Sequence, residues 1–197
     1  MSKKNPTIQS LGKQPPKIVQ NGNPVLRHIA ETVLIKDITT PHIQKLIADM
    51  KSALDPEKDG VALAAPQIGV ALRIFIVSGL ILAAADEKYA PKNPPNGTRH
   101  GANDMVFINP EIIKVSREKE DVEEGCLSVR YLYGTISRSK KVTLRAYDEY
   151  GQKIERGASG LLAQIFQHET DHLNGVLFID RARDIQEILP EEMERRK

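Results

Sequence analysis

The chain has 197 residues, which is the length of one domain with at most a small appendage. Its 28 Lys and Arg residues nearly balance 26 Asp and Glu residues, and a net charge of +2 gives no sign of the basic surface that binds nucleic acid. A single cysteine excludes an internal disulfide framework and fits a reducing compartment. We therefore expect one cytoplasmic domain spanning residues 1–197, with no direct nucleic-acid binding.

The first elements in chain order are a tail and a helix. Residues 1–20 contain no apolar stretch long enough for a secretory signal and predict a loose tail. From Thr40, the sequence TPHIQKLIADMKSAL places Pro41 at a helix start and repeats apolar residues at helical spacing. This pattern predicts an amphipathic helix with one apolar face, formed by Ile43, Leu46, Ile47, Met50 and Leu54. The apolar region 61–85 is interrupted by Pro66 and Arg73, so no membrane span is expected.

Short segments rich in β-branched residues predict a mostly antiparallel sheet, and they lie at 73–77, 105–109, 141–147 and 152–155. Leu127 and Val129 also have a strand-like pattern. Between Ser78 and Asp104 a long insertion loop on the surface is predicted, because the stretch 83–104 holds three prolines and two glycines among scattered charges. The charged end at 181–197 predicts a short exposed helix or tail.

A further helix is predicted between Ser159, a candidate N-cap, and Gly175, a candidate stop signal. His168, Glu169 and His172 fall within its apolar arc, where ionisable groups are costly unless they are paired. The sequence HETDH is an H-E-x-x-H motif, in which two imidazoles one turn apart can bind one metal ion beside a glutamate that carries protons. The helix is therefore expected to bind a metal.

A catalytic metal needs a third protein ligand and one open position. The candidates are Cys126, the three other histidines (His28, His42 and His100) and the carboxylates of the C-terminal region, such as Glu187, Glu191 and Glu192. Cys126 follows Gly125 in EEGCLSV, where a thiolate is a better ligand than a glutamate on a weakly packed tail. Three kinds of protein remain open at this point: a hydrolase using Cys126, a metalloprotease using a tail carboxylate, and a structural module whose metal site is closed by a fourth protein ligand.

Three segments in this order resemble the motifs of peptide deformylase: GVALAAPQIG at 60–69, EGCLS at 124–128 and QHETDHLNG at 167–175. The family patterns are G-x-G-L-A-A-x-Q, E-G-C-L-S and Q-H-E-x-D-H. The similarity continues through NPVLR at 23–27, INPEI at 108–112 and GVLFIDR at 175–181. It implies an α+β fold of mostly antiparallel sheets packed around a central metal-binding helix, and an enzyme that removes the N-formyl group from formyl-methionine.

The resemblance also implies roles for individual residues. Cys126, His168 and His172 would bind the metal with water as the fourth ligand, and Glu169 would act as general base and then as acid. Gln67 and the backbone N–H of Leu127 would bind the oxyanion. The family implies Fe²⁺, with Zn²⁺, Ni²⁺ or Co²⁺ as possible substitutes, whereas the ligand types alone favour zinc.

The substrate would be a formyl-Met peptide, naturally a nascent chain at the ribosome, and we expect a monomer. Its contacts are expected from Gly60, Val61, Ala62, Glu124, Gly125, Leu161 and Ile165. Glu124 would also pair with Arg138, although the acidic run at 118–124 could equally be a solvated surface. The chain departs from the family pattern at Ala62, which replaces a glycine, and at Arg130, where many members have proline.

Overall fold

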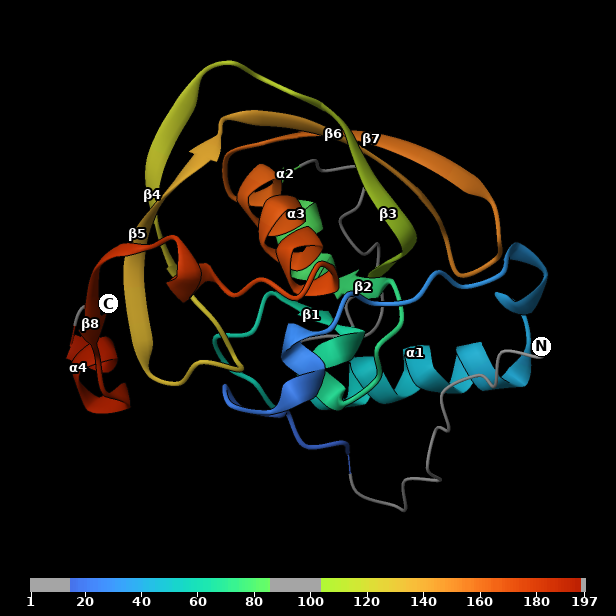
Figure 1. Ribbon diagram of the computed structural model, residues 1–197, viewed down its shortest axis with the longest axis horizontal. Helices are drawn as coiled ribbons and strands as arrows, with labels where there is room; N and C mark the ends of the chain where they lie inside the picture. The colour runs from blue at the N-terminus through green and yellow to red at the C-terminus, as the bar shows by residue number, and fades with distance from the viewer. Residues whose placement is uncertain (1–14, 86–103, 196–197) are drawn as a thin grey trace.

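The computed structural model describes residues 15–85 and 104–195. Two antiparallel sheets surround one central helix, α3 (Gly160–Leu173), and a second long helix, α1 (Pro41–Leu54), packs against the edge of the first sheet (Figure 1). This arrangement confirms the predicted α+β class with mostly antiparallel sheets around a central helix. No helix in the described ranges is both long and apolar enough to cross a membrane.

The first sheet has five strands in the order β1-β2-β3-β6-β7, and every neighbouring pair is antiparallel. The strands are β1 (Ala62–Ala64), β2 (Ile74–Val77), β3 (Met105–Val115), β6 (Lys141–Tyr147) and β7 (Lys153–Ser159). The four segments that the β-branched pattern predicted correspond to β2, β3, β6 and β7. Strand β1 lies at an edge of this sheet, so one side of its backbone is not covered by a neighbour in the sheet order.

The second sheet has the order β4-β5-β8 and consists of β4 (Lys119–Gly125), β5 (Leu132–Ser139) and β8 (Arg183–Glu187). The strand expected at Leu127 and Val129 is wrong, because β4 ends at Gly125 and the chain then turns. In that turn the Val129 N–H donates to the Cys126 carbonyl at 3.0 Å, which bends the backbone out of the sheet. Cys126 therefore sits immediately after the last strand residue.

An aromatic cluster joins α3 to the first sheet. Phe75 of β2 stacks on Phe107 of β3 with ring centroids 4.8 Å apart, and Phe166 of α3 meets Phe107 edge to face at 5.1 Å. All three rings are fully buried, which contributes strongly to stability because each removes a large apolar area from water. Helix α1 buries all five apolar residues that its sequence pattern indicated.

The predicted N-cap and stop signal of α3 are confirmed in part. Ser159 occupies the N-cap position, but its side chain makes no capping hydrogen bond. At the other end Gly175 has a φ of 73°, a left-handed conformation that ends a helix and favours glycine. A Cβ atom at this position would lie 2.6 Å from the Arg27 carbonyl oxygen, so the close approach of the N-terminal region also requires glycine.

Three predicted irregular regions contain more structure than expected. In the predicted insertion loop 78–104, the apolar sequence GLILAAA forms α2 (Gly79–Ala85), whereas 86–103 lies outside the described residues. The charged C-terminal region does contain a helix, α4 (Pro190–Arg195), but β8 precedes it and pairs with β5. In the tail expected at 1–20, the Val19 N–H donates to the Gln67 carbonyl at 2.8 Å, while 1–14 lies outside the described residues.

Short 3₁₀ helices complete the described chain, at Pro24–Arg27, Ile35–Asp37, Ala65–Ile68 and Phe178–Asp180. The third of these follows β1 directly and carries Gln67. It brings that side chain next to the turn that follows β4.

Candidate metal centre

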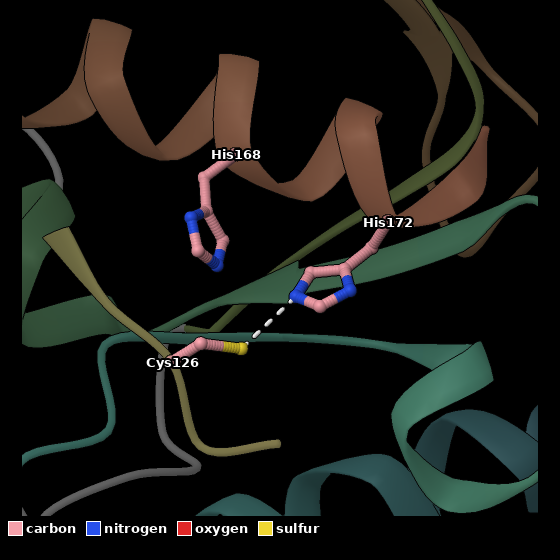
Figure 2. A group of neighbouring side chains, drawn as sticks. All are labelled: Cys126, His168 and His172. Atoms are coloured by element: carbon pink, nitrogen blue, oxygen red, sulfur yellow. Dashed lines mark hydrogen bonds between the residues drawn. The ribbon is translucent and has the colours of Figure 1, made fainter. Parts of the chain in front are cut away.

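Cys126, His168 and His172 come together between α3 and the turn after β4 (Figure 2). Their ligand atoms all lie within 4.8 Å of one another, and Cys126 Sγ is 3.2 Å from His172 Nε2. A thiolate and two imidazoles on a rigid helix and an adjoining turn form a donor set that suits a transition-metal ion. The metal-binding helix predicted from the H-E-x-x-H motif is therefore consistent with the structure.

The alternative third ligands within the described residues do not join this group, and His100 lies outside those residues. Glu187, Glu191 and Glu192 are exposed on β8 and α4, which lie at the left of Figure 1, apart from the central helix α3 that carries both histidines. Within 15–85 and 104–195, no second set of three or more His, Cys, Asp or Glu side chains gathers in the same way. The geometry thus favours a cysteine ligand over a carboxylate from the C-terminal region.

A buried ion-pair network stands behind His168. Its Nδ1 lies 2.9 Å from Glu124 Oε2, which leaves Nε2 available as a ligand atom. Glu124 in turn accepts from Arg138 Nε at 2.8 Å and from Arg138 Nη2 at 2.9 Å, so the predicted Glu124–Arg138 pair is present. Arg138 Nη1 also donates to Asp171 at 2.7 Å. Both Glu124 oxygens are therefore engaged in this network, and the carboxylate orients His168.

The network fixes the charge of Glu124. Burial alone raises the pKa of this carboxyl, but hydrogen bonds from His168 and Arg138 outweigh that effect and bring its pKa down to about 2. Burial lowers the pKa of His172 well below its ordinary value, which keeps its imidazole neutral, the form that binds metal ions.

Glu169 differs from Glu124 although both carboxyls are buried. Burial raises the pKa of Glu169 to about 7, and the side chain is only 4% exposed. Among the described residues, none forms a hydrogen bond with its Oε2 atom. A carboxyl that titrates near neutral pH and has a free oxygen can both accept and donate a proton.

Gln67 is held with its amide directed at the metal ligands. Its Oε1 accepts from the Ala64 N–H at 2.8 Å, and its Nε2 lies 3.2 Å from Ser128 Oγ and 3.6 Å from Cys126 Sγ. Leu127, the other predicted oxyanion residue, follows Cys126 in the same turn and is buried. Both groups therefore border the space next to Cys126.

A pocket of about 230 Å³ opens next to these side chains. Cys126, His168, Glu169 and Gln67 line its inner part. The residues expected to contact the substrate all line it as well: Gly60, Val61, Ala62, Glu124, Gly125, Leu161 and Ile165. Gly125 is required there because a Cβ atom would lie 2.5 Å from the Tyr133 ring.

Two features of the site were missed in the sequence. Gln20 Nε2 donates to the Leu127 carbonyl at 3.0 Å, although residue 20 was assigned to a loose tail. Arg130, noted only as a departure from the family pattern, forms ion pairs with Glu57 and Asp59 across the pocket opening. The partners are separated by about 70 residues or more in the chain, so no local pattern indicates them.

Comparisons with known proteins agree with this geometry. The sequence model of the polypeptide deformylase family matches residues 15–187. A peptide deformylase from Carboxydothermus hydrogenoformans is 43% identical over 169 residues, which cover 86% of this chain and 94% of that protein. The crystal structure of the peptide deformylase from Thermotoga maritima has a TM-score of 0.70 at 34% identity and covers 86% of this chain and 99% of that one. A Met-Ala-Ser-bound structure from Acinetobacter baumannii has a TM-score of 0.69 at 31% identity, covering 87% of this chain and 99% of that one.

Proposed function

The chain belongs to the polypeptide deformylase family, and from that premise we propose how its own residues remove the N-formyl group from the formyl-methionine of new polypeptides. The reaction is hydrolysis of a linear amide. Water adds to the formyl carbon, the C–N bond breaks, and formate and the free amine are released. The observation that carries the assignment is the Cys126–His168–His172 group beside Glu169, whose Oε2 has no hydrogen-bond partner among the described residues.

Cys126, His168 and His172 hold the metal ion in this proposal. The donor set fits, since one thiolate and two imidazoles converge within 4.8 Å and the pocket reaches two of the three ligands. A divalent ion held there supplies Lewis acidity, which lowers the pKa of water and polarises a carbonyl group. We propose Fe²⁺ on the family resemblance, with Zn²⁺, Ni²⁺ or Co²⁺ able to replace it. Metal analysis of protein purified without oxygen tests this choice.

Glu169 moves the proton. With its pKa raised to about 7 by burial, it is poised to accept the proton of the attacking water and to pass it to the departing nitrogen. The neighbouring carboxylate of Glu124 keeps its negative charge during this transfer, because Arg138 and His168 hold it ionised. The two buried carboxyls thus have different tasks: Glu169 gains and loses a proton, whereas Glu124 stays ionised.

Gln67 and the Leu127 N–H stabilise the charge that develops on the formyl oxygen. The Gln67 amide is well suited because its Oε1 is already bound to the Ala64 N–H, which aims the Nε2 group toward Cys126. A donor fixed before the reaction costs no reorganisation when the oxyanion forms.

The peptide lies along Gly60, Val61 and Ala62. These residues border the pocket at the edge of the five-stranded sheet, where an extended chain can add as a further strand. The methionine side chain enters the hollow between Gly125, Leu161 and Ile165, of which Ile165 is buried and Leu161 lies half exposed at its mouth. Ala62, where the family pattern has glycine, adds only a methyl group, and we expect activity to survive this departure.

The natural substrates are nascent chains at the ribosome, and the protein acts as a single-domain monomer in the cytoplasm without binding nucleic acid directly. A near-neutral net charge of +2 and a single cysteine support this setting.

The decisive experiment mixes freshly prepared, anaerobic, iron-loaded protein with a formyl-Met-Ala-Ser peptide and follows release of the free amine. Turnover is expected, and it should stop in the presence of a small hydroxamate that chelates an accessible metal. Absence of turnover in protein whose metal content has been verified would refute the proposal. Metal binding without hydroxamate inhibition would point instead to a closed structural site.

A further inference from the structure

The pocket lies between two walls that come from different parts of the chain. One wall runs from the end of α1 through residues 57–62 into β1, and the other runs from β4 through residues 123–133 into β5. At the inner end the walls are joined by the hydrogen bond between Gln67 Nε2 and Ser128 Oγ at 3.2 Å. The outer end has a second connection, which the H-E-x-x-H chemistry does not use.

Arg130 makes that outer connection. Its Nη1 donates to Asp59 Oδ2 at 2.7 Å, and its Nη2 donates to a carboxylate oxygen of Glu57. The Arg130 side chain is 24% exposed, and the side chains of its partners are 29% and 36% exposed, so both ion pairs are partly shielded from water. A guanidinium that binds two carboxylates with separate nitrogens fixes their positions more tightly than a point charge would.

We propose that Arg130 is a positioning residue for peptide binding: by holding Glu57 and Asp59, it fixes the segment Gly60–Ala62 against which the substrate chain pairs. The proposal rests on the proposed function of the pocket. Arg130 would thereby determine how well the enzyme binds residues that follow the formyl-methionine, and it would have little influence on the reacting groups.

The hydrogen bonds of the first wall show how Arg130 acts on it. The Glu57 N–H donates to the Leu54 carbonyl, and the Gly60 N–H donates to the Glu57 carbonyl, both at 3.0 Å. The turn that carries the two carboxylates therefore ends directly at Gly60, and a displacement of Glu57 moves the start of the peptide-pairing segment. Residues 57–59 belong to no helix or strand, so side-chain bonds are needed to hold them.

The second wall has its own support. The Tyr131 carbonyl accepts from the Ile188 N–H at 2.9 Å, and the Val129 N–H donates to the Cys126 carbonyl at 3.0 Å. Cys126 is also bordered by Gln67. Loss of the Arg130 ion pairs should for this reason loosen residues 57–62 and leave the metal ligands in place.

The test compares Arg130→Met with the unmodified metal-loaded enzyme on two substrates. For formyl-Met-Ala-Ser we expect KM to rise about tenfold with kcat within twofold, because binding is impaired and the reacting groups are not. For N-formylmethionine, which has no residue to place along the outer part of the groove, kcat/KM should change less than twofold. Arg130→Lys should recover part of the loss, since an ammonium can pair with one carboxylate. Arg145→Met removes an ion pair between β6 and β7, in which Arg145 lies 2.8 Å from Glu155 and the two side chains are 40% and 49% exposed, and it should change neither parameter.

A double-mutant comparison separates positioning from direct contact. Glu57→Gln with Asp59→Asn should raise KM for the tripeptide as Arg130→Met does, and adding Arg130→Met to that pair should raise it no further. If the KM increase of the combined variant were instead the product of the two separate increases, Arg130 would contact the peptide itself, and the proposal would be overturned. The proposal would also be overturned if Arg130→Met changed the KM for the tripeptide less than twofold, or if it lowered kcat/KM equally for both substrates. Failure of the proposed function is distinguishable, because it would appear as absent turnover in the unmodified enzyme.

Discussion

Replacement of Arg138 with methionine removes the cation from the buried network behind His168. The guanidinium makes three hydrogen bonds, two to Glu124 at 2.8 and 2.9 Å and one to Asp171 at 2.7 Å. The side chains of Arg138 and Glu124 are only 6% and 2% exposed, so water cannot replace the lost partner. Removing one member of a buried ion pair typically costs about 3–5 kcal/mol, and we expect the free energy of unfolding to fall by that amount at pH 7.

The ionisation of Glu124 gives a second estimate of how much the network contributes to the free energy of unfolding. Although burial raises the pKa of Glu124, its hydrogen bonds to His168 and Arg138 lower it from 4.5 to about 2, which corresponds to about 3 kcal/mol of stabilisation of the ionised form. Because the folded pKa is depressed, this stability is present above pH 4.5 and is lost as the pH falls through about 2. In Arg138→Met, burial and the hydrogen bond from His168 remain but the contribution of Arg138 is lost, so the pKa of Glu124 rises. The deficit of the variant should therefore be largest at neutral pH and shrink as the pH falls toward 2.

Urea unfolding of metal-free protein between pH 7 and pH 3.5, followed by circular dichroism, measures this deficit without a contribution from metal release. The matched control is the double variant Glu124→Gln/Arg138→Met, which removes both charges and should be more stable than Arg138→Met at pH 7. The difference in stability between the double variant and Arg138→Met should shrink as the pH falls and Glu124 becomes protonated in Arg138→Met. A deficit below about 1 kcal/mol, or one independent of pH, would refute the view that Arg138 holds Glu124 ionised.

Three further predictions concern the metal ligands, the proton carrier and the oxyanion donor. Cys126→Ala should lose the metal, as measured by plasma mass spectrometry, whereas Glu191→Gln/Glu192→Gln should keep it; the reverse would favour a carboxylate ligand. Glu169→Gln should keep its metal and lose about 10²- to 10⁴-fold in kcat in the amine-release assay, and near-normal kcat would exclude Glu169 as proton carrier. Gln67→Ala should lose about 10²-fold in kcat with KM changed less than threefold, and a loss confined to KM would show that Gln67 binds substrate only.

The sequence predicted best the elements whose signal is local. Helix α3 was placed between Ser159 and Gly175, and it runs from Gly160 to Leu173. Helix α1 buries each of its predicted apolar positions. The imidazoles at 168 and 172 are one turn apart on one helix, so their proximity follows from helix geometry alone. Cys126 is 42 residues before His168, and its place next to them was expected from its surroundings and from the family resemblance.

The second sheet could not be predicted in the same way because two of its three strands, β4 and β8, are polar. In β4, KEDVEEG contains a single apolar residue, Val122, and every residue of β8 is exposed. Both strands are held by pairing with β5, and neither has the alternating apolar pattern that indicates a strand. In β8 the pairing also joins distant parts of the chain, because Glu187 lies opposite Leu132. The bond between Glu124 and His168, 44 residues apart, was hidden for the same reason.

The polar face of α3 explains why the two halves of the metal centre stay aligned. Gln164, Gln167 and Asp171 of this helix all form hydrogen bonds with the second sheet. Gln164 Nε2 donates to the Glu123 carbonyl at 2.8 Å, while the Gln167 amide both accepts from and donates to the backbone of Ser139, each at 3.0 Å. Asp171 accepts from Arg138 of β5.

These bonds connect the helix that carries the two histidines to the sheet whose strand β4 ends beside Cys126. The opposite arc of the helix is packed into the first sheet through Phe166. The ligands at 168 and 172 therefore lie on a helix fixed from both sides, and the separation between the imidazoles and the thiolate is set by hydrogen bonds and packing that form on folding. A site held in this way is organised for metal binding and for the reaction before either takes place.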